Sequence, residues 1–179
     1  MKKENIPNIL TIIRFILIPF LYISVLSHHY LTALIIFTIS ALTDILDGYI
    51  ARKYNYITDI GKLIDPLADK LTQISLLLSL AILKILPWRI FAIVFIKELV
   101  LIVSSSVLYS KKDVVVYSKW YGKLATTLFY LAIVASLVIN HFNITIAFRV
   151  DLYLYYLAIL ATVFALVMYS IKFEFKRDR

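Results

Sequence analysis

The sequence predicts an all-α fold, an integral membrane bundle of six transmembrane helices. Hydrophobic residues make up 62% of its 179 residues and charged residues 17%, against roughly 45–50% and about 25% in soluble globular domains. The apolar residues come in long runs, and a helix needs about 20 of them to cross a bilayer. Six segments approach that length, so the solvent for most of this chain is lipid.

The expected spans follow one another with short polar connections. Arg14 and Pro19 interrupt the first apolar run, which has no small-residue cleavage site, so it is a span rather than a secretory signal. Neither a repeat nor a low-complexity linker divides the chain, which predicts a single domain over residues 1–179. The absence of cysteine from the sequence excludes disulfides, thiolate metal sites and cysteine nucleophiles. The six spans are expected at Ile9–Leu26, Leu31–Ala51, Leu63–Leu86, Ile90–Tyr109, Trp120–Ile139 and Leu152–Ile171.

The distribution of Lys and Arg predicts that both termini face the cytoplasm. Cytoplasmic loops of membrane proteins carry an excess of these residues, and with the N-terminus inside, the opposite side holds only Lys84, Arg89 and Arg149. Because the basic residues lie between apolar runs rather than in one stripe, the net charge of +8 does not indicate a nucleic-acid partner. The cytoplasmic side would carry Lys2, Lys3, Arg52, Lys53, Lys111, Lys112, Lys119, Lys172, Lys176, Arg177 and Arg179.

Aspartates gather around the connection between the second and third spans. Asp44 and Asp47 share one face of a helix with Gly48, and Asp65 and Asp69 share a face of the next. A charged side chain at the bilayer centre costs roughly 2.5–3.5 kcal/mol, so these four face a polar cavity, where they repel one another unless cations neutralise them. Oxygen ligands without His or Cys favour Mg²⁺, Mn²⁺ or Ca²⁺ over zinc, and four carboxylates are enough for two ions.

Glycine is rare in this chain, and two of its three glycines, Gly48 and Gly61, lie within the acidic cluster. This placement predicts a close approach of the backbone to a ligand. The alternative interpretation is a small-residue contact between packed helices.

One spaced pattern runs through the cluster and resembles that of a known enzyme family. The pattern is D-x2-D-G-x2-A-R-x8-G-x3-D-x3-D, and it is similar at every specified position to the signature of the CDP-alcohol phosphotransferases. Similarity also covers Asn5–Asn8 with Thr11 and Arg14, the six-span layout, and Gly122–Lys123. The specified residues of the pattern are Asp44, Asp47, Gly48, Ala51, Arg52, Gly61, Asp65 and Asp69.

The resemblance implies a phosphatidyltransferase that moves a phosphatidyl group from CDP-diacylglycerol to an alcohol and releases CMP. It implies that Asp44, Asp47 and Asp65 hold two Mg²⁺ or Mn²⁺ ions on the diphosphate. Asp69, also near the metals, would be the general base that takes the proton of the acceptor hydroxyl.

Further positions acquire roles from the same resemblance. Lys123 is the candidate for the acceptor's phosphate, and a homodimer is implied. The composition is typical of a bacterial protein, which would place the active site at the cytoplasmic face of the cytoplasmic membrane. The positions that would bind the nucleotide or line its pocket are Asn8, Thr11, Arg14, Gly48, Arg52 and Thr58.

The start Asn5–Asn8 and the short six-span form favour sn-glycerol 3-phosphate as acceptor, giving phosphatidylglycerol phosphate. The rival within the family is a cardiolipin synthase that uses phosphatidylglycerol. Two positions depart from the glycerol-phosphate branch, which usually has Arg where this chain has Lys97 and often has Lys where it has Ala125. Outside the family, an intramembrane prenyltransferase or a cation transporter would also use clustered aspartates.

Three charged residues within spans have simpler interpretations. Arg14 could extend its side chain to the nearby interface without binding phosphate. Lys97 and Glu98 could form a buried pair without substrate contact. Because they are adjacent, they point about 100° apart on a helix and need not touch.

Overall fold

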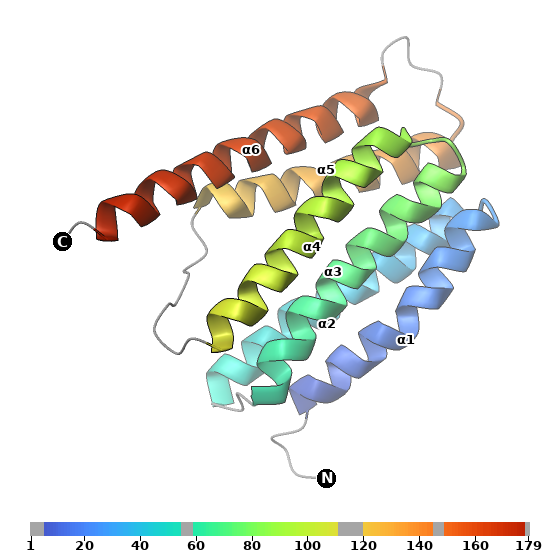
Figure 1. Ribbon diagram of the computed structural model, residues 1–179. Helices are drawn as coiled ribbons and strands as arrows, with labels where there is room; N and C mark the ends of the chain where they lie inside the picture. Colours follow the sequence, from blue (N-terminus) through green and yellow to red (C-terminus); the bar gives the residue numbers. More distant parts are fainter. Residues whose placement is uncertain (1–5, 55–58, 111–119, 145–148, 178–179) are drawn as a thin grey trace. The chain divides into compact units, whose positions relative to one another are not determined.

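The computed structural model is all-α, as the sequence predicts, and it describes residues 6–54, 59–110, 120–144 and 149–177. The largest difference from the expected bounds is at the C-terminus, where the last helix continues to Arg177 rather than ending at Ile171. Figure 1 shows the six helices along the chain. They are α1 (Ile6–Leu26), α2 (Tyr30–Tyr54), α3 (Asp59–Ile82), α4 (Trp88–Ser110), α5 (Trp120–His141) and α6 (Val150–Arg177).

Four of these helices are long and apolar enough to cross a membrane, which makes the chain a multi-pass membrane protein. They contain the segments Ile9–Leu26, Tyr30–Ala51, Gly122–His141 and Val150–Met168. In α3 and α4, charged residues interrupt the apolar sequence. Those residues are Asp59, Lys62, Asp65, Asp69 and Lys70 in α3, and Arg89, Lys97 and Glu98 in α4.

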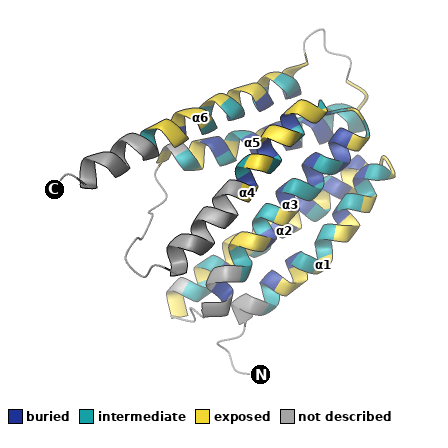
Figure 2. Cartoon of the chain, in the orientation of Figure 1, coloured by how far each residue is buried: buried dark blue, intermediate teal, exposed yellow. Residues whose placement is uncertain are grey.

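The distribution of burial is the reverse of that in a soluble protein. Large apolar side chains are exposed, among them Ile45 at 64% and Leu160 at 66%, whereas Arg14, Glu98 and Asp151 are at most 2% exposed. Figure 2 shows exposed residues along the helices with buried residues between them. Lipid tails would cover the exposed apolar faces, and the buried charges require partners inside the protein.

The chain divides into two compact units, residues 1–91 with 137–143, and residues 92–136 with 144–179. In the first unit, α1 packs against both α2 and α3. Its contact faces bury apolar residues such as Leu21 and Val25 of α1, Ala33 of α2, and Leu76 and Leu80 of α3. A side chain on the packed face of α1 can therefore reach both neighbours.

The described turns are built without glycine. His28, Lys84 and Asn143 take the left-handed conformation at φ 60°, 58° and 48°. At the end of α1, the N–H of His29 donates to the carbonyl of Ser24 and that of His28 to Val25, which closes the helix in the Schellman pattern. The three glycines lie within α2, α3 and α5 instead, where glycine costs about 1 kcal/mol relative to alanine.

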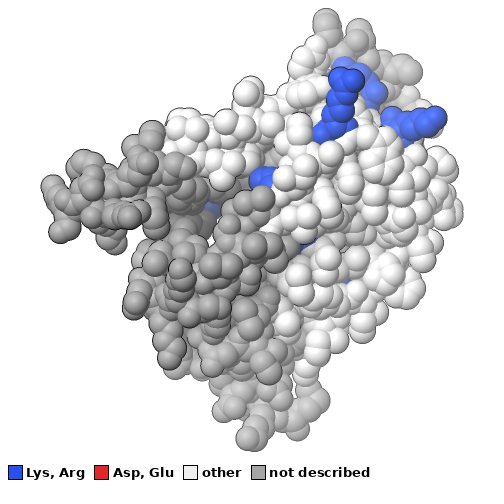
Figure 3. All heavy atoms as spheres, viewed as in Figure 1, with Lys and Arg blue, Asp and Glu red and all other residues white. Residues whose placement is uncertain are grey.

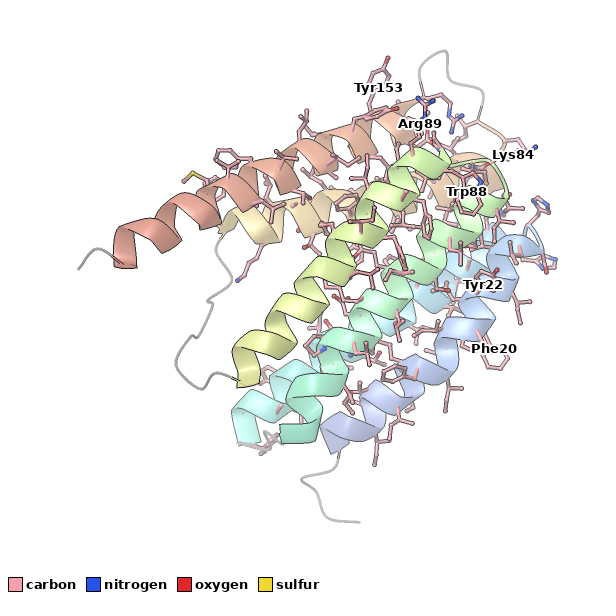
Figure 4. The ribbon with its side chains drawn as sticks, in the orientation of Figure 1. Phe20, Tyr22, Lys84, Trp88, Arg89 and Tyr153 are labelled. Atoms are coloured by element: carbon pink, nitrogen blue, oxygen red, sulfur yellow. The ribbon has the colours of Figure 1, made fainter. Side chains whose placement is uncertain are left out.

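The turn between α3 and α4 carries basic and aromatic side chains. Figure 4 shows Lys84, Trp88 and Arg89 around this turn, and Trp88 is 53% exposed. The described residues on the face drawn in Figure 3 are mostly uncharged, with a few Lys and Arg side chains exposed among them. Exposed Trp with Lys or Arg at a helix end is typical of a membrane–water interface.

The second unit contains a buried polar network between α5 and α6. The Asp151 carboxylate, 1% exposed, accepts hydrogen bonds from Arg149 Nε at 3.2 Å and Nη2 at 3.0 Å. The Ser136 hydroxyl lies 3.4 Å from Asp151 Oδ2 and 3.5 Å from the Tyr155 hydroxyl. These contacts hold the start of α6 against α5.

We expect Asp151→Asn to lower the free energy of unfolding by about 1–3 kcal/mol, because the fork of charge-assisted hydrogen bonds from Arg149 is lost. Thermal unfolding in detergent measures the change. Tyr153→Phe is the control on the same helix, since Tyr153 is 63% exposed. Equal unfolding temperatures for the two variants would show that the charge of Asp151 contributes nothing to stability.

Candidate active site

The four aspartates, Thr11 and Arg14 lie in the halves of α1, α2 and α3 that share one end. Because α1 and α2 are joined by a tight turn, α1 begins where α2 ends, and the short connection to α3 starts that helix at the same end (Figure 1). At 1.5 Å per residue, Thr11, Arg14, Asp47 and Asp65 lie about 7–12 Å along their helices from this end. Asp44 and Asp69 lie about 15 Å from it.

Arg14 forms ion pairs with both carboxylates of α2. Its Nη2 lies 2.5 Å from Asp47 Oδ2 and its Nη1 lies 2.9 Å from Asp44 Oδ1. Arg14 and Asp47 are 2% and 3% exposed, whereas the Asp44 side chain is 50% exposed. The interpretation of Arg14 as a side chain reaching to the interface is therefore wrong, because it turns inward to two buried or half-buried partners.

Thr11 contacts the first carboxylate of α3. Its hydroxyl donates a hydrogen bond to Asp65 Oδ1, and Thr11 is fully buried. Because Thr11 and Arg14 are three residues apart, they lie on one face of α1. A single turn of α1 therefore binds Asp65 on one neighbour and Asp44 and Asp47 on the other.

The four aspartates also act on one another through their charges. Asp44 interacts electrostatically with Asp65 and Asp69, and Asp47 with Asp65 and Asp44. Because like charges repel, the four carboxylates require positive charge beside them. Arg14 supplies one such charge.

The donors present suit a hard divalent cation. They are carboxylate oxygens, and a buried guanidinium is already drawn to two of them. As the side chains stand, no three acidic, His or Cys residues within the described part of the chain are close enough to hold one metal ion. Arg14 lies against the oxygens of Asp44 and Asp47 that such an ion would need.

Glycine occupies two places beside these carboxylates. Gly48 follows Asp47 on α2 and is half-buried, and Gly61 is buried one turn before Asp65 on α3. Neither has a positive φ among the described residues, so both are helical and neither serves a turn. Neither glycine has a side chain that would fill the space beside it, and the close approach of a ligand there stays a prediction.

Several other predicted site residues lie in the second unit or outside the described side chains. Lys123 is exposed on α5 in the second unit. Thr58 lies outside the described residues, as do the side chains of Asn8 and Arg52. Their roles remain predictions.

Lys97 and Glu98 form the buried pair that the sequence left open. Lys97 Nζ lies 2.5 Å from Glu98 Oε1, with Glu98 fully buried. The ammonium also lies 5.1 Å from the centre of the Phe129 ring, within range of a cation–π contact. The two side chains do touch, because both are long enough for their charged ends to meet across the angle between them.

Sequence reasoning missed one polar residue below the carboxylates. Gln73 is 1% exposed, and neither its amide nitrogen nor its amide oxygen hydrogen-bonds to the described residues. It follows Asp65 and Asp69 at four-residue intervals, so it extends their face of α3 by one turn. The four-residue interval could have identified Gln73 from the sequence. The polar face of α3 is therefore longer than the aspartates alone indicate.

Known proteins resemble this sequence over most of its length. A family model described as CDP-alcohol phosphatidyltransferase matches residues 4–169. The chain belongs to the CDP-alcohol phosphatidyltransferase family. This phosphatidyltransferase is 34% identical to a protein of Aquifex aeolicus over 142 residues, which cover 78% of this chain and 79% of the other. It is also 34% identical to a protein of Haemophilus influenzae over 176 residues, which cover 93% and 92%.

Both relatives are named CDP-diacylglycerol--glycerol-3-phosphate 3-phosphatidyltransferase. A protein of Rickettsia bellii with the same name is 45% identical over a shorter stretch of 71 residues, 38% of this chain and 39% of that one. The match to the family model contains every aspartate of the cluster.

We expect Thr11→Val to lower the unfolding free energy of the phosphatidyltransferase by about 1.5–3 kcal/mol, because Asp65 loses a buried hydroxyl donor while the side chain keeps its shape. Thermal unfolding in detergent measures the loss. Thr127→Val is the matched control, since Thr127 is exposed and its hydroxyl bonds to the carbonyl of Lys123 on its own helix. If both variants lose the same stability, the bond to Asp65 is not what holds α1 to α3.

Proposed function

We propose that the chain transfers a phosphatidyl group from CDP-diacylglycerol to sn-glycerol 3-phosphate, giving phosphatidylglycerol phosphate and CMP. The observation that carries the proposal is the convergence of Asp44, Asp47 and Asp65 on one turn of α1, within a chain of the CDP-alcohol phosphatidyltransferase family. The names of the Aquifex and Haemophilus relatives support this acceptor. The prenyltransferase and cation-transporter hypotheses have no comparable support.

The carboxylates of α2 and α3 would bind the donor's diphosphate through divalent cations. Asp44, Asp47 and Asp65 would hold two Mg²⁺ or Mn²⁺ ions, with Asp69 beside them. When bound, the ions neutralise the diphosphate and stabilise the charge that develops on its oxygens. Asp47 is buried and Asp44 half-exposed, so the cluster has one sealed side and one side that a ligand can approach.

Asp69 would act as the general base. Its carboxylate takes the proton of the acceptor hydroxyl while that oxygen forms a bond to the phosphorus bearing the diacylglycerol. The bond from this phosphorus to the CMP oxygen breaks, and CMP leaves. Transfer of this kind depends on positioning and charge neutralisation more than on covalent chemistry.

The remaining proposals complete the site. Gly48, Arg52 and Thr58 would contact the cytidine nucleotide, with Asn8, Thr11 and Arg14 lining its pocket. Lys123 would contact the phosphate of the acceptor.

The proposed topology places this chemistry at the cytoplasmic surface. All six helices, α3 and α4 included, would cross the membrane as one domain with both termini cytoplasmic. A lipid donor then keeps its tails in the bilayer while its head group meets a water-soluble acceptor. A homodimer in a bacterial cytoplasmic membrane is the proposed assembly.

An acceptor assay tests the proposed reaction. We expect purified protein with labelled CDP-diacylglycerol and Mg²⁺ or Mn²⁺ to form phosphatidylglycerol phosphate and CMP when glycerol 3-phosphate is present, and to form nothing after chelation with EDTA. Product with phosphatidylglycerol but not with glycerol 3-phosphate would instead identify a cardiolipin synthase. Release of pyrophosphate in place of CMP would rule out the whole reaction class.

We expect Asp69→Asn to reduce turnover by at least about 10²–10⁴-fold, the usual contribution of a general base, while binding of the donor nucleotide persists. The measurement is kcat in the same assay, with CDP binding determined in parallel. Asp151→Asn is the control, because it makes the same carboxylate-to-amide change in the second unit; assayed well below its unfolding temperature, it should retain activity. Substantial turnover by Asp69→Asn would remove the base assignment.

A further inference from the structure

Arg14 is the one side chain of α1 that contacts both α2 carboxylates in the described structure. Its distances of 2.5 Å to Asp47 Oδ2 and 2.9 Å to Asp44 Oδ1 are those of close ion pairs. At 2% exposure it is held away from water. The guanidinium thus lies on the oxygens that the proposed function assigns to divalent cations.

A guanidinium and a metal ion cannot both occupy this position. Mg²⁺ binds carboxylate oxygens at about 2.0–2.1 Å, and a nitrogen 2.5 Å from the same oxygen fills that space. The two cations would also repel each other at such a separation. Arg14 and a divalent cation therefore compete for Asp44 Oδ1 and Asp47 Oδ2.

The guanidinium is only partly satisfied where it lies. Its Nε is buried and has no hydrogen-bond acceptor among the described residues, and Nη1 approaches Asp44 without the alignment of a hydrogen bond. A buried donor without an acceptor carries the free-energy cost of lost hydration. A ligand that presents several acceptor oxygens, such as a diphosphate, would satisfy these donors better.

The balance of charge also favours a diphosphate as the partner of Arg14 when cations are bound. Four carboxylates carry four negative charges, and Arg14 offsets one of them. Two divalent cations would offset all four, after which the charge of Arg14 has no partner within the cluster. The diphosphate of the donor, which arrives with the cations, supplies one.

We propose that Arg14 is an exchangeable counter-ion. It neutralises Asp44 and Asp47 while the site is without ligand, releases both carboxylates when divalent cations bind, and then pairs with the diphosphate of the CDP-lipid. The proposal rests on the proposed function. Its consequence is that nucleotide and metal bind cooperatively, because the diphosphate stabilises Arg14 in the position that the metal requires.

Manganese affinity tests the proposal without measuring turnover. Binding of Mn²⁺ to purified protein in detergent is followed by the loss of the free-ion paramagnetic resonance signal, with and without CDP. We expect Arg14→Met to bind Mn²⁺ at least about tenfold more tightly than the wild type when CDP is absent, and to lose most of the gain that CDP produces in the wild type. Metal-free Arg14→Met should unfold at a lower temperature than the wild type, and Mn²⁺ should raise that temperature by more.

Two further variants sharpen the result. Arg149→Met removes an arginine from the second unit by the same substitution and should leave Mn²⁺ affinity unchanged. Arg14→Lys keeps the charge but lacks the fork that contacts two carboxylates at once, so we expect an affinity severalfold tighter than in the wild type. This variant decides the matter if Arg14→Met does not fold.

The outcomes separate the two proposals. Wild-type protein that binds Mn²⁺, together with Arg14 variants that bind it equally or more weakly, would show that Arg14 is a fixed group that orients the carboxylates, and would overturn only the exchange. Wild-type protein that binds no Mn²⁺ would overturn both the exchange and the proposed metal site.

Discussion

Buried carboxylates in a lipid-facing bundle need positive charge beside them, and much of this structure serves that need. The partner on α1 is Arg14, which is buried and bridges Asp44 and Asp47. Thr11, one turn earlier, holds Asp65 by its hydroxyl. Three helices are thus joined by polar contacts, while buried apolar residues such as Leu21, Val25 and Leu76 lie along the same helices.

The order of the helices makes this convergence possible. A tight turn folds α2 back along α1, and a short connection starts α3 beside the end of α2, so residues far apart in sequence come to a similar depth. Because α1 packs on both α2 and α3, side chains from one turn of its packed face can contact carboxylates on both helices. The rigid helical backbone then sets the depth of the carboxylates from the helix ends, without any loop within the cluster.

The sequence predicted the helices and the aspartate cluster but not the contacts between them. Apolar runs and the Asp–Gly spacing are local signals, and both were sufficient to place the helices to within a few residues and the aspartates on shared faces. The partner of Arg14 depends on which way a long, flexible side chain turns. The contact of Lys97 with Glu98 likewise depends on how both side chains extend, and spacing along a helix fixes neither. The contact of Asp151 with Ser136 likewise joins positions whose proximity only the packing of α5 and α6 decides.

The left-handed turns have a practical consequence for experiments on this protein. Residues other than glycine at positive φ are strained by roughly 1–2 kcal/mol each, least for asparagine, and here such positions are His28, Lys84 and Asn143. All three lie at helix ends distant in sequence from the carboxylates. Glycine at one of these positions would relieve backbone strain without altering the residues of the proposed site. Such variants offer a route to thermally more stable protein for crystallisation or cryo-microscopy.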